Sequence, residues 1–391
     1  MRFANRIAQM DTSAIRELLA LTEHPDIISF GGGLPAPEVF PLEDMRRATD
    51  KVYRTRGRAA LQYSSSTGLH SLREKIAQRH RSRGIACTAE EVLIVSGSQQ
   101  GLDVAGKVFL DPGDLVVCEN PTYLAALTVF RSYECGILPI ETDAGGMIPE
   151  DLERKLKANP RVKLMYVIPT FQNPTGKTWS LERRRGVLAL AEKYGIPVLE
   201  DDPYGDLRYE GEALPTLKAM DTAGIVTYMG SFSKILTPGL RLGWMIAAPE
   251  LLEKYAGAKE CADLQASTIS QMVVDTYLED CDLEENIRRL NRLYRERRDL
   301  MLSLLGSEFP AQARWTHPCG GLFLWAAMPE QIDTAALMPV MTANKVAYIP
   351  GRDFFANRDV HNCLRLNFSN ASEKQMLQGV KTMGRLFREA L

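Results

Sequence analysis

Between residues 92 and 247 the sequence alternates short apolar runs with longer amphipathic segments. Seven runs rich in β-branched and other apolar residues recur there: EVLIV, DLVVCE, GILPIE, KLMYVIP, IPVLED, GIVTYMG and LGWMIAA. Helical patterns such as QQGLDVAGKVFL, PEDLERKLKAN and SLERRRGVLALAEKYG lie between several of them. Continuous apolar runs are typical of strands buried on both faces, and helical connections let such strands run parallel. The pattern predicts an α/β fold with a mostly parallel seven-stranded sheet.

The chain has 391 residues, which is too long for one ordinary hydrophobic core. After about residue 255 the pattern becomes helical, and it then mixes helices with the strand-like runs GGLFLWAAMP, KVAYIPG and CLRLNFS. We therefore expect a large domain over residues 45–275 and a smaller α+β domain over residues 276–391. Residues 1–44, which include the helical pattern SAIRELLAL, would form an arm and part of the smaller domain.

Charge and cysteine usage exclude several classes of protein. The formal net charge of -2 provides no basic surface field, so nucleic acid is not an expected partner. The seven cysteines include no C-x-x-C pair, which argues for a reducing compartment and against a disulfide framework or a zinc site. The sequence has neither the apolar core of a signal peptide nor an apolar run of ~18 residues that could span a membrane. We expect a cytoplasmic protein without a metal or a membrane partner.

Polar residues follow four of the predicted strands, at the edge where open α/β sheets bind their ligands. The first strand leads into SGSQQGL, a small glycine-containing turn that opens a helix. Its free backbone N–H groups, together with Ser98 and Gln99, would suit a phosphate. The strand KLMYVIP leads into TFQNPTG, which places Asn173 beside a proline turn.

Two further strands are followed by an acid, a phenol and two cations. Asp201 and Tyr204 come after PVLE, in the segment DDPYGD. The strand VTYMG is followed by small hydroxyl side chains and basic residues on both sides of a Pro-Gly turn: Ser231, Ser233, Lys234 and Arg241. Parallel strands end at the same edge of a sheet, so we expect these side chains to lie close together.

Each of these features also has a simpler explanation. NPTG is usually only a turn, and a single lysine or acid after a strand is usually solvated or structural. DDPYGD lacks the acid spacing and the distal glutamate of a calcium loop. NPTGKT lacks the glycine that a nucleotide P-loop needs at its start, where this chain has Phe171. The joint order and position of the features favour one shared site.

A phosphate cradle, a lysine, an acid, an amide and a phenol together suit pyridoxal phosphate. Lys234 would bond to its aldehyde as a Schiff base, which requires a neutral amine, and burial beside Arg241 would lower the lysine pKa. Asp201 would keep the pyridine nitrogen protonated through a buried ion pair. Asn173 and Tyr204 would hydrogen-bond the ring oxygen. The phosphate would be held by Ser98, Gln99, Ser231, Ser233 and Arg241, whose guanidinium offers a bidentate fork.

Five segments, in the same order and over nearly the whole chain, resemble the pyridoxal-phosphate-dependent aminotransferases of fold type I, class I and II: SGSQQGL, FQNPTG, EDDPYG, SFSKILTPGLRLGW and CLRLNFS. Other segments resemble the 2-aminoadipate and kynurenine aminotransferase subgroup: IREL, GGLPAPEVFP, LQYSSSTG, SGSQQGLDVAGKVFLDPGD and ENPTYLAAL. The resemblance implies the fold type I architecture, with the large and the small domain described above.

The resemblance also implies roles that spacing does not show. Arg365 would bind the substrate α-carboxylate, and Tyr123 would stack on the cofactor ring. Tyr63 would reach the phosphate or the substrate from the neighbouring subunit, so the active unit would be a homodimer. Gly33 would let the backbone approach the substrate, and Arg16 would face its distal end.

Other readings of these positions stay open at this point. An exposed helix charge is the alternative for Arg16, and a strand-edge salt bridge is the alternative for Arg365. Core packing is the alternative for Tyr123 and Tyr63. The chain also departs from the family pattern after Tyr204, since it has Gly205 where bulky residues are common. This glycine predicts a wider or looser site.

The expected reaction is a ping-pong transamination, in which Lys234 acts as general base and acid. The donor would be an L-amino acid of the 2-aminoadipate, glutamate, aromatic or branched-chain type, and the acceptor a 2-oxo acid such as 2-oxoglutarate. A C–S β-lyase or a decarboxylase is an alternative, because the same cofactor can break other bonds. A cofactor-binding regulator is a further alternative, but the arm begins almost at residue 1, so we expect no helix-turn-helix domain.

Overall fold

Eight strands form the largest sheet of the computed structural model, which describes residues 3–8 and 26–391. In spatial order they are β2 (Val92–Val95), β9 (Gly243–Ile246), β8 (Val226–Ser231), β7 (Val198–Asp201), β6 (Val162–Val167), β3 (Leu115–Asn120), β4 (Gly136–Asp143) and β5 (Gly146–Met147). The strands β8, β7, β6, β3 and β4 run parallel, and β9 is antiparallel to both of its neighbours. The mostly parallel α/β sheet is thus confirmed, and all seven predicted strands are present. The eighth strand, β5, has only two residues and extends β4 as a hairpin, which is too short for an apolar pattern.

Helices cover both faces of this sheet, because successive strand residues point to opposite sides. Tyr166 and Leu199 share an apolar core with residues of α5, α6 and α10. Met165 and Val198 share another core with residues of α7, α8 and α9. Each central strand is therefore mainly apolar on both faces, which is the pattern that identified it. The helices of the described residues are α1 (Asn5–Ala8), α3 (Leu42–Ala60), α4 (His70–Arg81), α5 (Ser98–Phe109), α6 (Leu124–Ser132), α7 (Pro149–Ala158), α8 (Leu181–Tyr194), α9 (Leu217–Met220), α10 (Pro249–Asp263), α11 (Thr268–Asp280), α12 (Leu283–Glu308), α13 (Met338–Ala343) and α14 (Glu373–Glu389).

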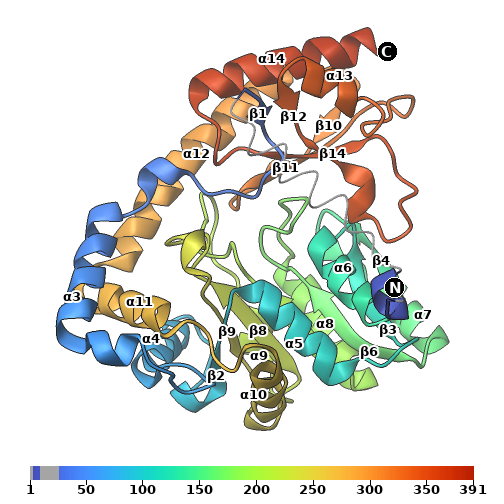
Figure 1. Ribbon diagram of the computed structural model, residues 1–391. Helices are drawn as coiled ribbons and strands as arrows, with labels where there is room; N and C mark the ends of the chain where they lie inside the picture. The colour runs from blue at the N-terminus through green and yellow to red at the C-terminus, as the bar shows by residue number, and fades with distance from the viewer. Residues whose placement is uncertain (1–2, 9–25) are drawn as a thin grey trace.

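A second, four-stranded sheet comes from the C-terminal part of the chain. Its order is β10 (Arg314–Trp315), β11 (Phe323–Ala327), β14 (Cys363–Asn367) and β13 (Ile349–Pro350), and all of its pairs are antiparallel. Figure 1 shows this sheet with α14 at the top of the molecule and the large sheet below it, and α12 rises along the left side from near α11 to α14.

The N-terminal segment pairs with the C-terminal part of the chain. Strand β1 (Ile28–Ser29) runs parallel to β12 (Val346–Ala347), and Ile28 lies in register with Val346. This pairing supports the division into residues 1–44, 45–275 and 276–391, which we retain as a proposal. In residues 3–8 and 26–391, no helix combines the length and the apolar character needed to span a bilayer.

Candidate active site

A cavity of about 280 Å³ lies at the carboxyl ends of β6, β7 and β8. Its walls include side chains or backbone from the large sheet, from the glycine segment near residue 32 and from the small sheet. Most of the residues predicted for the site line it: Gly33, Ser98, Gln99, Tyr123, Asn173, Asp201, Tyr204, Ser231, Ser233, Lys234, Arg241 and Arg365. Tyr63 is not part of the wall, and its side chain is 77% exposed in the single chain. Arg16 lies outside the described residues.

One end of the cavity is built to receive an anion. Helix α5 begins at Ser98 without a side-chain cap, and in its first turn only the Gln100 N–H bonds to the N-cap carbonyl of Gly97, so the N–H groups of Ser98 and Gln99 have no partner within the helix. Gly97 precedes it with a φ of 84°, a left-handed conformation that favours glycine. A Cβ at this glycine would lie 2.6 Å from Nη2 of Arg241, so the guanidinium lies directly over the loop. Backbone donors and a guanidinium that converge in this way suit a phosphate.

Two serines and the free charge of Arg241 complete this anion site. Ser231 ends β8, and its hydroxyl oxygen accepts a hydrogen bond of 3.1 Å from the backbone N–H of Ser233. The guanidinium of Arg241 donates to the carbonyl of Pro238 at 3.3 Å. Within the part of the chain that the structure describes, no ion pair to a carboxylate is found for Arg241. Its positive charge therefore remains available to a ligand.

Lys234 lies between the anion site and Arg365. Its Nζ donates a hydrogen bond of 2.6 Å to the backbone carbonyl of Gly33. Burial lowers the pKa of Lys234 to about 8, and the positive charges of Arg365 and Arg241 add to this effect. The lowered pKa agrees with the expectation from the sequence, except that Arg365 contributes more than Arg241. The neutral amine, which attack on a carbonyl requires, is consequently populated at a lower pH than in an ordinary lysine and reaches one half near pH 8.

We expect Lys234 of the cofactor-free enzyme to react with a small aldehyde with a midpoint near pH 8, because the neutral amine is the nucleophile. Reductive trapping at a series of pH values, followed by peptide mass spectrometry, measures this midpoint. In the Arg365→Gln variant the midpoint should move upward, since one repelling charge is removed. A midpoint at the ordinary lysine value of 10.5 in the unaltered enzyme would contradict the environment described here.

Asp201 provides an open, buried acceptor in the cavity. The residue ends β7 and is 3% exposed. Its Oδ2 accepts a hydrogen bond of 2.9 Å from the hydroxyl of Tyr166, whereas its Oδ1 is buried and has no partner in the described part of the protein. Burial raises the pKa of Asp201 to about 7, which the Tyr166 hydrogen bond opposes. A cationic N–H donor placed against Oδ1 would complete this carboxylate.

Arg365 enters the cavity from the small sheet. It lies in the middle of β14, in register with Trp325 on one side and Ile349 on the other. Its Nη1 donates to Oδ1 of Asn173 at 2.8 Å, and its Nη2 donates to the carbonyl of Gly31 at 2.7 Å. Burial lowers the pKa of Arg365 to about 10.

Aromatic rings, and no acid, surround this buried guanidinium. Its central carbon lies 4.1 Å from the ring centroid of Phe323 and 5.1 Å from that of Phe354. No carboxylate forms an ion pair with Arg365 anywhere in residues 3–8 or 26–391. The alternative of a strand-edge salt bridge is therefore wrong. A buried guanidinium with only neutral partners is suited to bind a carboxylate that arrives from solution.

Two tyrosines also line the cavity. Tyr204 is 4% exposed and packs edge to face against Phe323, with 5.7 Å between the ring centroids. Tyr123 directly precedes α6, and burial raises the pKa of its phenol. Burial also raises the pKa of the Tyr204 phenol, so both phenols stay protonated at neutral pH and can donate a hydrogen bond.

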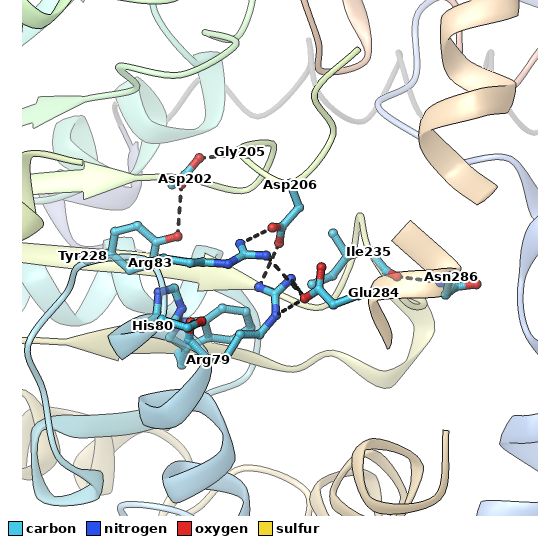
Figure 2. A network of polar contacts seen from close by, with 12 residues as sticks. Arg79, His80, Arg83, Asp202, Gly205, Asp206, Tyr228, Ile235, Glu284 and Asn286 are labelled. Carbon is cyan, nitrogen blue, oxygen red and sulfur yellow. Dashed lines mark hydrogen bonds and ion pairs between the residues drawn. The ribbon is translucent and has the colours of Figure 1, made fainter. Parts of the chain in front are cut away.

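The expectation that Gly205 widens this cavity is wrong. Gly205 does not line it but lies on another cavity, together with Asp202 and Tyr228. A Cβ at Gly205 would lie 2.5 Å from a carboxylate oxygen of Asp202, so the glycine makes room for that side chain. Figure 2 shows the Gly205 N–H and the Tyr228 hydroxyl donating to Asp202. The physical reason is that successive residues at the end of a strand point to opposite faces.

Sequence reasoning missed two residues that shape the site. Tyr166 holds Asp201, and Phe323 contacts both Tyr204 and Arg365. The only signal for Tyr166 is a hydroxyl within the buried run KLMYVIP, and Phe323 follows the glycine pair in GGLFLW. Neither signal distinguishes a site residue from ordinary core packing.

Pyridoxal phosphate fits these residues on three structural observations. The loop at Gly97 has no room for a side chain beneath Arg241, as a phosphate cradle requires. Asp201 has an orphaned acceptor for a ring N–H, and Lys234 is a partly buried lysine with a lowered pKa. Phosphate, ring nitrogen and aldehyde thus each have a chemically suitable group in one cavity.

Comparison with known proteins gives consistent matches over the whole chain. A family model described as aminotransferase class I and II matches residues 25–383. Aromatic-amino-acid aminotransferase 1 of Thermococcus litoralis is 43% identical over 394 residues, covering 100% of this chain and 94% of the relative. The 2-aminoadipate transaminase of Thermus thermophilus is 40% identical over 100% of this chain and 97% of its own length. The crystal structure of Pyrococcus horikoshii kynurenine aminotransferase, in complex with PMP, superposes with a TM-score of 0.95 at 42% identity, over 100% of this chain and 97% of the other.

Proposed function

This chain belongs to the class I and II aminotransferases, and we propose that it takes its amino group from an L-amino acid with an aromatic or other apolar side chain. The enzyme is a pyridoxal-phosphate-dependent transaminase. One observation carries the choice of donor: the cavity joins the guanidinium of Arg365, which has no acid partner in the described part of the chain, to a group of apolar side chains in its wall. The apolar part consists of Leu34, Leu124, Ala125, Ile168 and Phe323. An amino acid with an apolar side chain suits both parts of the cavity, because its carboxylate can bind Arg365 and its side chain can contact the apolar residues.

We assign each polar group of the cavity a part in binding. Pyridoxal phosphate, when bound, supplies an aldehyde that takes up the amino group and a ring that accepts the electrons of the broken Cα–H bond. Asp201 would hold the ring nitrogen, while Asn173 and Tyr204 would hydrogen-bond the ring oxygen. Tyr123 would lie against the ring. The phosphate would be held by Ser98, Gln99, Ser231, Ser233 and Arg241.

Two residues of the chain act on the substrate itself. The guanidinium of Arg365 binds the α-carboxylate and fixes the orientation of the α-carbon. Nζ of Lys234 takes the α-proton in its neutral form, which the lowered pKa makes more populated, and later returns the proton. Gly33 lets the chain pass close to both groups, and its carbonyl orients the lysine amine.

The named relatives act on two kinds of donor, one aromatic and one with a second carboxylate. We favour the aromatic kind, because the described lining residues include two cations besides Arg365, Lys234 and Arg241, and both of these are assigned to the cofactor. Arg16, which is predicted to face the distal end of the substrate, lies outside the described residues. Its role stays a prediction, which would extend the range to 2-aminoadipate and glutamate. The proposed acceptor is a 2-oxo acid such as 2-oxoglutarate.

We propose a homodimer in which Tyr63 completes the site of the neighbouring subunit. Three large apolar side chains of this region are exposed in the single chain: Leu61 by 72%, Tyr63 by 77% and Leu264 by 55%. The two segments that carry them are joined by a hydrogen bond from the Ser64 N–H to the Gln265 side chain. Exposed apolar groups gathered in this way favour contact with another protein surface. A cytoplasmic location is proposed from the seven cysteines, all of which are free thiols.

The alternatives on the same fold are less favoured. A C–S β-lyase, a decarboxylase and a cofactor-binding regulator would all use the same cavity, but the relatives described above carry the names of aminotransferases. Transamination also needs one place where two different carboxylates bind in turn, and Arg365 offers it.

An absorbance spectrum of the purified holoenzyme tests the proposal. Amino acids are added one at a time, first alone and then with 2-oxoglutarate. We expect phenylalanine, tyrosine or leucine to bleach the visible band of the lysine-bound cofactor, and the oxo acid to restore it. If only glutamate or 2-aminoadipate bleaches the band, the apolar donor class is wrong. If the band bleaches and the oxo acid never restores it, the reaction is a lyase or a decarboxylation.

A further inference from the structure

Two neighbouring carboxylates at the end of β7 are held by tyrosines from opposite faces of the sheet. Tyr166 in β6 is in register with Leu199, two residues before Asp201, so it shares the face of Asp201. In the same way, Tyr228 in β8 is in register with Glu200, two residues before Asp202. The Tyr166 hydroxyl donates to Oδ2 of Asp201 at 2.9 Å, and the Tyr228 hydroxyl donates to Oδ2 of Asp202 at 3.0 Å.

The two carboxylates differ in their second oxygen. Oδ1 of Asp202 accepts a hydrogen bond of 2.9 Å from the backbone N–H of Gly205, so both oxygens of this acid are satisfied by the protein, as Figure 2 shows. Oδ1 of Asp201 has no partner in the described part of the chain, although it is buried and the residue lines the active cavity. The protein thus supplies hydrogen-bond donors to both oxygens of Asp202, but it leaves Oδ1 of Asp201 open to a ligand.

Tyr166 is held rigidly in its place behind Asp201. Its side chain is completely buried, and its ring packs edge to face against Phe130 with 5.7 Å between the centroids. Burial and the adjacent Asp201 raise the pKa of the phenol well above its usual range. The hydroxyl therefore keeps its proton and can only donate to the carboxylate.

We propose that Tyr166 is a positioning residue for the cofactor, which fixes the Asp201 carboxylate through Oδ2 and so presents Oδ1 as a charged acceptor to the protonated ring nitrogen. The inference rests on the proposed role of Asp201. A hydrogen bond to one oxygen stops the rotation of the carboxylate and favours its ionised form. Without the hydroxyl, a buried acid in this place is more readily protonated and no longer matches a cationic donor.

Equilibrium binding to the apoenzyme tests this inference without any turnover. Two ligands are compared: pyridoxal phosphate, and the analogue in which carbon replaces the ring nitrogen. Three proteins are compared: the unaltered chain, Tyr166→Phe, and Tyr228→Phe as matched control. Each variant removes a tyrosine hydroxyl that donates a hydrogen bond to an aspartate at the end of β7. Only Tyr166 bonds to the aspartate that lines the cavity, Asp201.

We expect Tyr166→Phe to bind pyridoxal phosphate about tenfold more weakly, which is the usual size for a lost hydrogen bond to a charged group. It should bind the carbon analogue as the unaltered chain does, because the analogue has no N–H for Asp201. Tyr228→Phe should match the unaltered chain for both ligands. An equal loss for both ligands in Tyr166→Phe would show a general loosening of the cavity and overturn the proposal.

Two other results would also overturn the proposal. In the first, the unaltered chain binds pyridoxal phosphate more tightly than the analogue, and Tyr166→Phe keeps the whole of this difference. Asp201 then binds the ring nitrogen equally well without the Tyr166 hydrogen bond. If the unaltered chain binds both ligands equally, Asp201 does not contact the ring nitrogen and the role of Tyr166 fails with it. The second result is separate from the assignment as a transaminase, which the bleaching of the visible band decides.

Discussion

Lys234→Ala is expected to lower the transamination rate by about 10,000-fold, because proton transfer by a positioned side chain contributes up to this factor. The same substitution should remove the visible absorbance of the lysine-bound cofactor, since no other lysine lines the cavity among the described residues. The cofactor should still bind, because Asp201 and Arg241 are unchanged. Steady-state rates and an absorbance spectrum of the reconstituted variant measure the two effects.

Two further lysine variants show whether the lost activity comes from the missing base, from the missing positive charge or from a general disturbance of the fold. Lys234→Arg keeps the positive charge but cannot lose its proton at working pH, so it should be as inactive as the alanine variant. Lys177→Ala removes a lysine that bonds the carbonyl of Asp143 outside the cavity, and it should keep the visible band and most of the activity. Turnover that survives in Lys234→Ala would disprove the assignment of the base.

Arg365→Gln is expected to lower kcat/KM for amino acid donors by about 100- to 1,000-fold. The reason is that a buried guanidinium without an acid partner is the strongest binding group for a carboxylate in this cavity, and truncating one partner of such a pair costs about 2–5 kcal/mol. Comparing L-phenylalanine with 2-phenylethylamine isolates the effect. The amine has no carboxylate, so its low reactivity should be the same in the variant and in the unaltered enzyme.

Arg208→Gln is the matched control for this arginine. The Arg208 guanidinium also stacks on an aromatic ring, 4.7 Å from the centroid of Phe171, but it lies outside the active cavity. This variant should discriminate between the two donors as the unaltered enzyme does. If Arg365→Gln lowers the activity with the amine as much as with the amino acid, Arg365 supports the fold of the cavity rather than binding the carboxylate.

The positions of Lys234, Asp201 and Asn173 could be predicted because the edge of a parallel sheet is a strong geometric constraint. Each of these residues comes after a buried strand, and parallel strands bring their C-terminal ends to one edge of the sheet. The apolar runs indicated the strands reliably, since a strand covered on both faces is mainly apolar and carries its few polar residues near its end, as β7 does. Among the strands described for the large sheet, only β5, with two residues, carried no pattern.

The supporting contacts could not be predicted, because they depend on which residues of neighbouring strands lie side by side. Tyr166 serves Asp201 only because β6 and β7 pair with Tyr166 opposite Leu199. A shift of one residue would place its hydroxyl on the other face of the sheet. Gly205 was misjudged for a related reason, since closeness in sequence to Tyr204 suggested closeness to the cavity. Register and alternation, not sequence distance, decide such contacts.

The lysine and the arginine of the cavity are both held by neutral oxygens. Gly33 and Gly31 offer backbone carbonyls to Lys234 and Arg365, and Asn173 adds an amide oxygen. A carboxylate in place of these groups would have to be displaced each time a substrate enters. The amino donor and the oxo-acid acceptor of a transaminase bind to the same site in turn. Each of them meets positive charges on Lys234 and Arg365 that are not paired with a carboxylate in the described part of the protein. The cavity can therefore exchange one anion for another without first breaking an ion pair of its own.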